Sequence, residues 1–104
     1  MMIARSWSAR ATREGAQAYV RYFQDTLAPQ LAALAGFRGA SIHQGTRDDV
    51  VELLVITRWA SIGAIRGFAG PDHEQAVVEP EARALLVSFD ERVAHRTIVL
   101  DLAL

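Results

Sequence analysis

The three histidines of this 104-residue chain, His43, His73 and His95, are its clearest candidates for proton transfer or metal binding. Imidazole titrates near neutral pH and is also a common metal ligand. His43 and His95 fall on predicted strands at opposite edges of one sheet, so one metal ion cannot join them within a subunit. His73 lies in a predicted loop near a tryptophan-led helix. We therefore predict His73 as the catalytic residue and no metal site, against the commoner alternative that each histidine is simply half-buried or at the surface.

Aromatic side chains could form an apolar cleft for a flat ligand, because small-molecule sites are lined mostly by hydrophobic and aromatic side chains. We predict substrate contacts from Trp7, Tyr22, Trp59 and Phe68. The alternative for Trp59 is that it only fills the core at the end of a buried strand. Arg83 is predicted to bind an anionic substrate group, with solvation or pairing to a carboxylate as its alternative.

Two further aromatic residues belong to the predicted first helix. Tyr19 and Phe23 lie on its apolar stripe and are expected in the core. Tyr22 lies off that stripe and is expected at the rim of a cleft.

Composition limits the classes of protein that the chain can be. Hydrophobic residues make up 51% and charged residues 22%, which is typical of one globular domain, here residues 1–104. The net charge is −1 with dispersed arginines, so we expect no nucleic-acid or membrane partner. The sequence has no cysteine, lysine or asparagine, which excludes thiolate chemistry and a Schiff-base lysine. No signal peptide or spanning segment is expected, which favours a cytoplasmic protein.

Alternating and continuous apolar runs predict four strands. Their predicted ranges are Met2–Arg10, Phe37–Gly45, Val50–Trp59 and Arg92–Leu100. The second and third strands form a hairpin through a polar turn.

Start and stop signals predict the helices between these strands. The first helix begins at a Thr12 cap and kinks or restarts at Pro29. A serine cap and a Gly-Pro stop define a helix over Ile62–Ala69. A last helix opens at Pro80, with its buried positions at Ala82, Leu85, Leu86 and Phe89. The resulting order predicts a ferredoxin-like, split βαβ α+β fold: a four-stranded antiparallel sheet, first and third strands central, with helices on one face.

The third predicted strand is apolar on both sides, with Val51, Leu53 and Val55 on one side and Leu54 and Ile56 on the other. The chain's own helices can cover only one face of the sheet. We therefore predict a homodimer that packs sheet against sheet. The alternative is a moderately apolar face that stays in water, and a molecular mass in solution distinguishes the two.

The residues after the third strand resemble the antibiotic biosynthesis monooxygenase (ABM) superfamily. The resemblance rests on Trp59-x-Ser61-x-x-Ala64-Ile65-x-x-Phe68-Ala69-Gly70-x-Asp72, Ala76-Val77-Val78, Pro80-Glu81-Ala82, Leu85-Leu86, Phe89-Asp90 and Val93-x-His95. It implies a dimeric α+β barrel with a pocket in each subunit between the sheet and its helices.

Members of this superfamily use the pocket in different ways. Some oxidise aromatic polyketide intermediates with molecular oxygen and no cofactor, some degrade haem, and many have no established reaction. The oxygenating members carry an asparagine and a tyrosine where this chain has Val55 and Ile65, and they share its Trp59. The haem-degrading members carry a tryptophan and a histidine where this chain has Phe68 and Val78.

Together these observations predict a cofactor-independent monooxygenase that acts on a small, electron-rich, polyketide-like aromatic compound. Trp59 and Phe68 would hold the ring, and His73 or a tyrosine hydroxyl would take the proton. Two alternatives stay open: a non-catalytic binding or detoxifying module of the same fold, and, less favoured, a haem-degrading enzyme.

Overall fold

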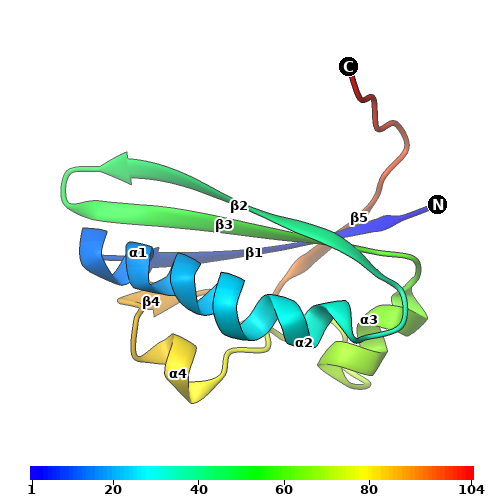
Figure 1. Cartoon of the computed structure of the whole chain (residues 1–104), viewed down its shortest axis with the longest axis horizontal. Coiled ribbons are helices and arrows are strands. Elements are labelled where there is room, and N and C mark those ends of the chain that lie inside the picture. Colours follow the sequence, from blue (N-terminus) through cyan, green and yellow to red (C-terminus); the bar gives the residue numbers. More distant parts are fainter.

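The computed structural model describes residues 1–104 as an α+β protein (Figure 1). Its elements, in chain order, are β1 (Ile3–Ala11), α1 (Arg13–Tyr22), the π-helix η1 (Phe23–Leu27), α2 (Ala28–Ala32), β2 (Phe37–Arg47), β3 (Val50–Trp59), α3 (Ile62–Ala69), α4 (Pro80–Arg83), β4 (Ser88–Phe89) and β5 (Ala94–Thr97).

The strands form one antiparallel sheet with β1 and β3 in the middle. The order is β2-β3-β1, and β4 and β5 both pair with the far side of β1. β1 and β3 pair along their whole length, from Ile3 opposite Trp59 to Ala11 opposite Val51. The helices lie on one face of this sheet (Figure 1). The predicted fold class and the central place of the first and third strands are therefore confirmed.

The first helical segment follows its predicted signals. Thr12 accepts a 3.0 Å hydrogen bond from the Gly15 amide, which caps α1. The wider π turn η1 then precedes α2, in which Pro29 occupies the first turn, where its missing amide proton is tolerated. The backbone therefore stays helical through Pro29, where a kink or a restart was predicted, and the irregularity is the π turn that precedes it.

Two glycines take backbone conformations that other residues rarely adopt. Gly36 has φ +84°, and a Cβ there would lie 2.4 Å from the Ala64 Cβ of α3. Gly39 has φ +140° at the point where the β2–β3 register shifts by a bulge. Gly36 therefore lets the segment before β2 approach α3 closely.

The C-terminal part of the chain differs from the prediction. The helix at Pro80 is a single turn, and Phe89 lies in β4, a short strand that the pattern did not predict. The Val87 amide already donates to the Arg10 carbonyl of β1, so the chain joins the sheet before a longer helix can form. Leu85 and Leu86 still pack against the core as partly buried residues.

The predicted last strand is also interrupted and shorter. Residues 91–93 leave β1 and bond to residues 74–76, through the Ala76 amide to the Glu91 carbonyl and the Val93 amide to the Glu74 carbonyl. β5 covers only Ala94–Thr97, so the predicted strand residues Val99 and Leu100 are exposed beyond it. The edge position of the predicted fourth strand is therefore shared by β4 and β5.

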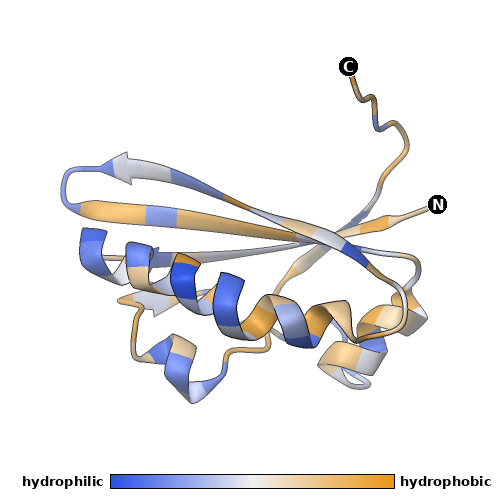
Figure 2. Ribbon diagram, viewed as in Figure 1, coloured by the Kyte–Doolittle hydropathy of each residue, from blue (hydrophilic) through white to orange (hydrophobic).

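One face of the sheet has no cover within the chain. On β3, Val51, Leu53 and Val55 are buried under the helices, whereas Val50 and Leu54 on the other face are 44% and 38% exposed. Figure 2 shows hydrophobic colour on β3 and along the tail after β5, which projects away from the fold. No helix is long and apolar enough to cross a membrane.

Candidate functional site

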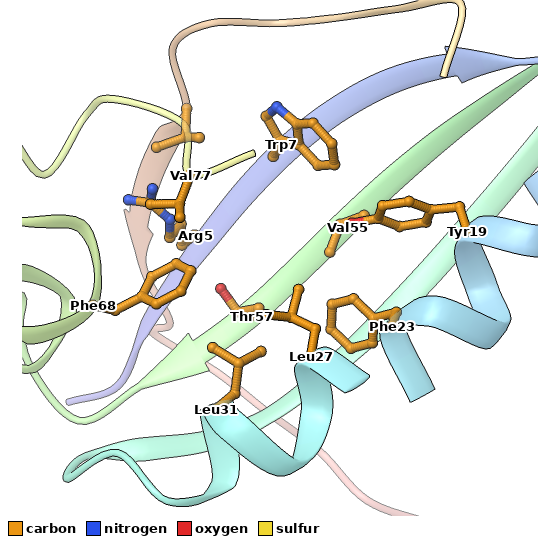
Figure 3. Close-up of a pocket in the computed structure, with 11 residues that line it drawn as sticks. Arg5, Trp7, Tyr19, Phe23, Leu27, Leu31, Val55, Thr57, Phe68 and Val77 are labelled. Carbon is orange, nitrogen blue, oxygen red and sulfur yellow. The ribbon is translucent and has the colours of Figure 1, made fainter. Parts of the chain in front are cut away.

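A small, mostly apolar cavity lies between the sheet and the helices (Figure 3). Its volume is about 50 Å³. Nine of its eleven lining residues are hydrophobic. The lining residues are Arg5, Trp7, Tyr19, Phe23, Leu27, Leu31, Val55, Thr57, Phe68, Val77 and Val93.

Strand alternation explains which sheet residues reach the cavity. Arg5 and Trp7 of β1 face the helices, as do Val55 and Thr57 of β3, because every second side chain points to the same side. The register places Arg5 directly opposite Thr57. Two central strands therefore supply the floor of the cavity.

The helical wall comes from α3 and from the continuous helix α1–η1–α2, which also contributes Tyr19 and Leu31. Phe23 and Leu27 begin and end the π-helix η1, so this wider turn presents both side chains to the cavity. Phe68 of α3 closes another side (Figure 3). The α3 helix is held by its predicted cap, a 3.1 Å bond from the Ala64 amide to Ser61 Oγ.

Arg5 is a buried cation at one end of the cavity, with an exposed fraction of 4%. Its Nη1 donates to the His73 carbonyl and to His95 Nε2 at 3.0 Å, and its Nη2 donates to the Gln75 carbonyl at 2.8 Å. Its guanidinium carbon lies 5.7 Å from the centre of the Phe68 ring. Burial lowers the pKa of the Arg5 guanidinium to about 10, so it is charged at neutral pH.

Thr57 is the second polar side chain at that end, and it is 8% exposed. Its Oγ1 accepts a 2.8 Å hydrogen bond from Trp59 Nε1. Because that oxygen already accepts one bond, its own proton is free to be donated elsewhere.

Of the predicted aromatic contacts, the structure brings Trp7 and Phe68 to the cavity. Trp59 is fully buried and lies behind Phe68, with ring centroids 5.6 Å apart and the rings stacked. It does not line the cavity, so it touches the site through Phe68 and Thr57. The predicted rim residue Tyr22 is buried against Tyr19, outside the lining.

Tyr19 and Phe23 were expected only in the core, yet both also line the cavity. Burial raises the pKa of the Tyr19 phenol, with a further contribution from Tyr22. Its hydroxyl therefore stays protonated at neutral pH and is suited to donating a hydrogen bond rather than to accepting a proton.

Arg83 lies away from the cavity, at the surface. Its Nε donates to the Val78 carbonyl at 3.2 Å, and its guanidinium carbon is 5.2 Å from the Phe89 ring centre. These contacts hold α4 to β4. The structure thus gives Arg83 packing partners and does not bring it to the other predicted site residues.

His73 and His95 lie beside each other, with ring centroids 5.1 Å apart, at the Arg5 end of the site. Because Arg5 can only donate, His95 Nε2 must accept, which makes this ring neutral with its proton on Nδ1. Burial lowers the pKa of His95, and the charges of Arg5 and His73 lower it further. His43 is on β2, at the opposite edge of the sheet, as predicted.

Arg5 and Thr57 line the cavity but were not predicted from the sequence as site residues. The alternation of side chains along each strand contained a signal for both residues. Arg5 lies on the same strand face as Trp7, and Thr57 lies on the same face as Trp59. The sequence of each strand alone does not give the register between β1 and β3. That register places Arg5 and Thr57 opposite each other.

This fold is that of solved antibiotic biosynthesis monooxygenase proteins. A candidate antibiotic biosynthesis monooxygenase from Bacillus cereus aligns with 100% of this chain and 97% of its own, with 16% identity and a TM-score of 0.65. SnoaB, a cofactor-independent oxygenase from Streptomyces nogalater, aligns over 98% of both chains with 18% identity and a TM-score of 0.63.

A third structure with this fold contains a ligand. The ActVA-Orf6 monooxygenase of Streptomyces coelicolor, in complex with nanaomycin D, aligns with 96% of this chain and 91% of its own, with 18% identity and a TM-score of 0.58. No protein-family model matches the sequence, and no curated protein gives a significant match. The resemblance seen in the sequence is therefore confirmed at the level of the fold.

Proposed function

We propose that this protein is a cofactor-independent monooxygenase that oxidises a small, electron-rich aromatic compound in the cavity between sheet and helices. The observation that carries the proposal is the cavity itself: aromatic side chains Trp7 and Phe68 line it, and its polar groups are few, with Arg5 and Thr57 at one end and the phenol of Tyr19 besides. Such a site removes water from a bound ring and fixes its orientation. The shared fold with SnoaB and the ActVA-Orf6 monooxygenase supports the reaction class.

The chemistry needs no external reductant. A substrate CH₂ group activated by a neighbouring aromatic ketone or phenol loses a proton, and the resulting carbanion reduces O₂. The hydroperoxide formed then loses water and leaves a carbonyl. Overall, CH₂ and O₂ give C=O and H₂O, and the substrate supplies all four electrons. The contributions asked of the protein are positioning, exclusion of water and stabilisation of the substrate anion.

The size of the cavity constrains the substrate. One water needs roughly 10–15 Å³ of such volume, and a site of about 150 Å³ holds benzene. At about 50 Å³ the cavity of this structure is smaller than one ring requires. Val77 is the more exposed of the two lining residues that lie outside helices and strands, so we propose that this side chain moves outward when a ring enters.

In this proposal the residues predicted from the sequence differ in how directly they contact the ligand. Trp7 and Phe68 contact the ring, and Trp59 supports Phe68 from behind. His73 remains the proposed proton acceptor; its ring lies beside that of His95, and its backbone carbonyl accepts from Arg5, outside the lining of the cavity. Tyr22 and Arg83 support the surrounding shell: Tyr22 packs on Tyr19, and Arg83 holds α4 to β4.

We also propose that two chains pair through the open face of the sheet. Val50 and Leu54 are exposed there, and the helices of the chain cover only the opposite face. The pairing buries apolar area that a monomer would leave in water.

Oxygen consumption tests the function. Purified protein should consume O₂ when supplied with an anthrone-type compound, faster than the compound oxidises alone. Phe68→Leu should lower this rate because Phe68 lines the cavity, whereas Phe37→Leu, an aromatic change outside the lining, should lower it much less. No O₂ consumption above the spontaneous rate would contradict the proposal.

One observation favours a second function, a binding module without turnover. No carboxylate or histidine side chain lines the cavity, so a proton acceptor in direct contact with the ligand is missing from its wall. A binding module would show ligand-induced stabilisation against heat without any O₂ consumption. The same ligand panel in the two assays separates the two functions.

A further inference from the structure

The polar end of the cavity contains hydrogen-bond donors with no matching acceptor. Besides the phenol of Tyr19 on α1, the polar side chains of the lining are Arg5 and Thr57. They are cross-strand neighbours on β1 and β3. A guanidinium has only donors, and the Thr57 oxygen already accepts from Trp59, so both residues present N–H or O–H groups.

Arg5 has donors left over. The guanidinium carries five N–H groups, and its three hydrogen bonds go to the His73 carbonyl, His95 Nε2 and the Gln75 carbonyl. Two N–H groups therefore have no partner in the protein.

Arg5 also has no counter-charge. None of the three ion pairs of the protein includes it. The acidic residues of the adjacent loop, Asp72 and Glu74, both pair with Arg92 instead, at 2.7 and 3.2 Å. Burying a charge costs free energy unless an opposite charge pairs with it. The Arg5 guanidinium is 4% exposed and has no carboxylate partner, so binding of an anion there would be stabilised by the missing pairing.

We propose that the cavity binds its aromatic ligand as a phenolate, whose oxygen accepts hydrogen bonds from the Arg5 guanidinium and the Thr57 hydroxyl while the ring lies against Phe68. This inference rests on the proposed function, because it names the ionised form in which the aromatic substrate is held. It assigns to Arg5 the anion-binding role that the sequence suggested for Arg83. Arg5 and Thr57 thus fix the oxygen, and the rest of the cavity, which is apolar except for the phenol of Tyr19, receives the ring.

The probe for this inference is 4-nitrophenol, because its phenolate absorbs visible light and its neutral form does not. It is too electron-poor to reduce O₂, so the result does not depend on turnover. Bound 4-nitrophenol should ionise at a lower pH than the free compound, and 4-nitroanisole, which cannot ionise, should bind at least tenfold more weakly at pH 8. Equal affinity for the two compounds, or no binding of the phenolate at millimolar concentration, would overturn the proposal.

Variants locate the effect at Arg5. Arg5→Met should weaken phenolate binding by roughly 10- to 100-fold, as expected for a hydrogen-bonded charge, and should leave 4-nitroanisole binding nearly unchanged. Arg5→Lys keeps the charge and should restore part of the affinity. Arg10→Met removes the same charge from the same strand, but its partners Ser88 and Asp90 are not cavity residues, so its phenolate binding should match the wild type.

Two outcomes separate this inference from the proposed function. Phenolate binding that depends on Arg5, without O₂ consumption by any electron-rich aromatic, supports the anion site and contradicts the oxygenase. O₂ consumption that is unaffected by Arg5→Met supports the oxygenase and overturns the anion site. If Arg5→Met fails to fold, Arg5→Lys replaces it as the test. The anion site would be overturned if Arg5→Lys bound the phenolate as tightly as the wild type and bound 4-nitroanisole equally well. Benzoate bound in preference to the phenolate would overturn the assignment to a phenolate.

Discussion

Trp59 donates its indole proton to the hydroxyl oxygen of Thr57, two residues earlier on the same strand, over 2.8 Å. Both side chains are on the helix-facing side of β3, and Trp59 is completely buried. The tryptophan of the superfamily-like motif therefore does not line the cavity in this protein. It orients a hydroxyl that does, and it supports Phe68 from behind.

This hydrogen bond predicts a difference between two substitutions at Thr57. Thr57→Val keeps the shape but leaves the buried Trp59 N–H without a partner, which should lower the free energy of unfolding by about 1–3 kcal/mol. Thr57→Ser keeps the hydroxyl and should retain most of this stability. Urea unfolding of both variants measures the difference, and equal stability of Val and Ser variants would show that the bond contributes little.

Gly36 offers a second test, this time of packing between the start of β2 and α3. Gly36→Ala should destabilise by about 1–3 kcal/mol, because its Cβ would meet the Ala64 Cβ at 2.4 Å and φ is positive. Gly67→Ala is the matched control, since nothing lies within 4 Å of its Cβ and it sits inside α3. It should stabilise by up to about 1 kcal/mol. Thermal melts that rank the two variants in the opposite order would contradict this packing.

The lowered pKa of His95 leads us to expect a loss of stability in mild acid. Its pKa is lowered in the folded state from an ordinary value of 6.5 by burial, Arg5 and His73, with Glu74 opposing. Below pH 6.5 the unfolded chain therefore binds a proton that the folded chain resists, so stability falls as the pH drops until the folded pKa is passed. His95→Gln should reduce this fall between pH 7.5 and 5.5 in chemical denaturation. An unchanged pH dependence in that variant would contradict the role of His95.

The open sheet face predicts a dimer in solution. Light scattering should give twice the mass of one chain, and Leu54→Glu should reduce it to that of a monomer by placing a charge at the interface. Gln17→Glu adds the same charge on the exposed side of α1 and should leave the mass unchanged. A monomeric wild type would mean that this face stays in water.

The sequence predicted the parts of the fold that depend on local signals. The α3 helix is one example, because Ser61 caps it and Gly70 ends it with φ +86°. The two central strands are another, because their apolar alternation is set by the single core beneath them. These features need no knowledge of distant residues.

The parts that were missed depend on pairing between distant segments. Residues 91–93 bond to residues 74–76 and so interrupt the expected last strand, which no pattern in residues 92–100 could reveal. The Arg5–Thr57 pair likewise depends on the register between β1 and β3. Of the four aromatic residues that line the cavity, Trp7 and Phe68 were therefore predicted as ligand contacts, whereas the charged Arg5 was not predicted there.

Reaction under isotopically labelled oxygen tests the central claim most directly. Purified protein is incubated with an anthrone-type aromatic under ¹⁸O₂, and the product is analysed by mass spectrometry. We expect one labelled oxygen atom per product molecule, with the second atom in water, and a strong loss of product in Phe68→Leu. Product oxygen that comes from water, or no product above the protein-free control, would contradict it.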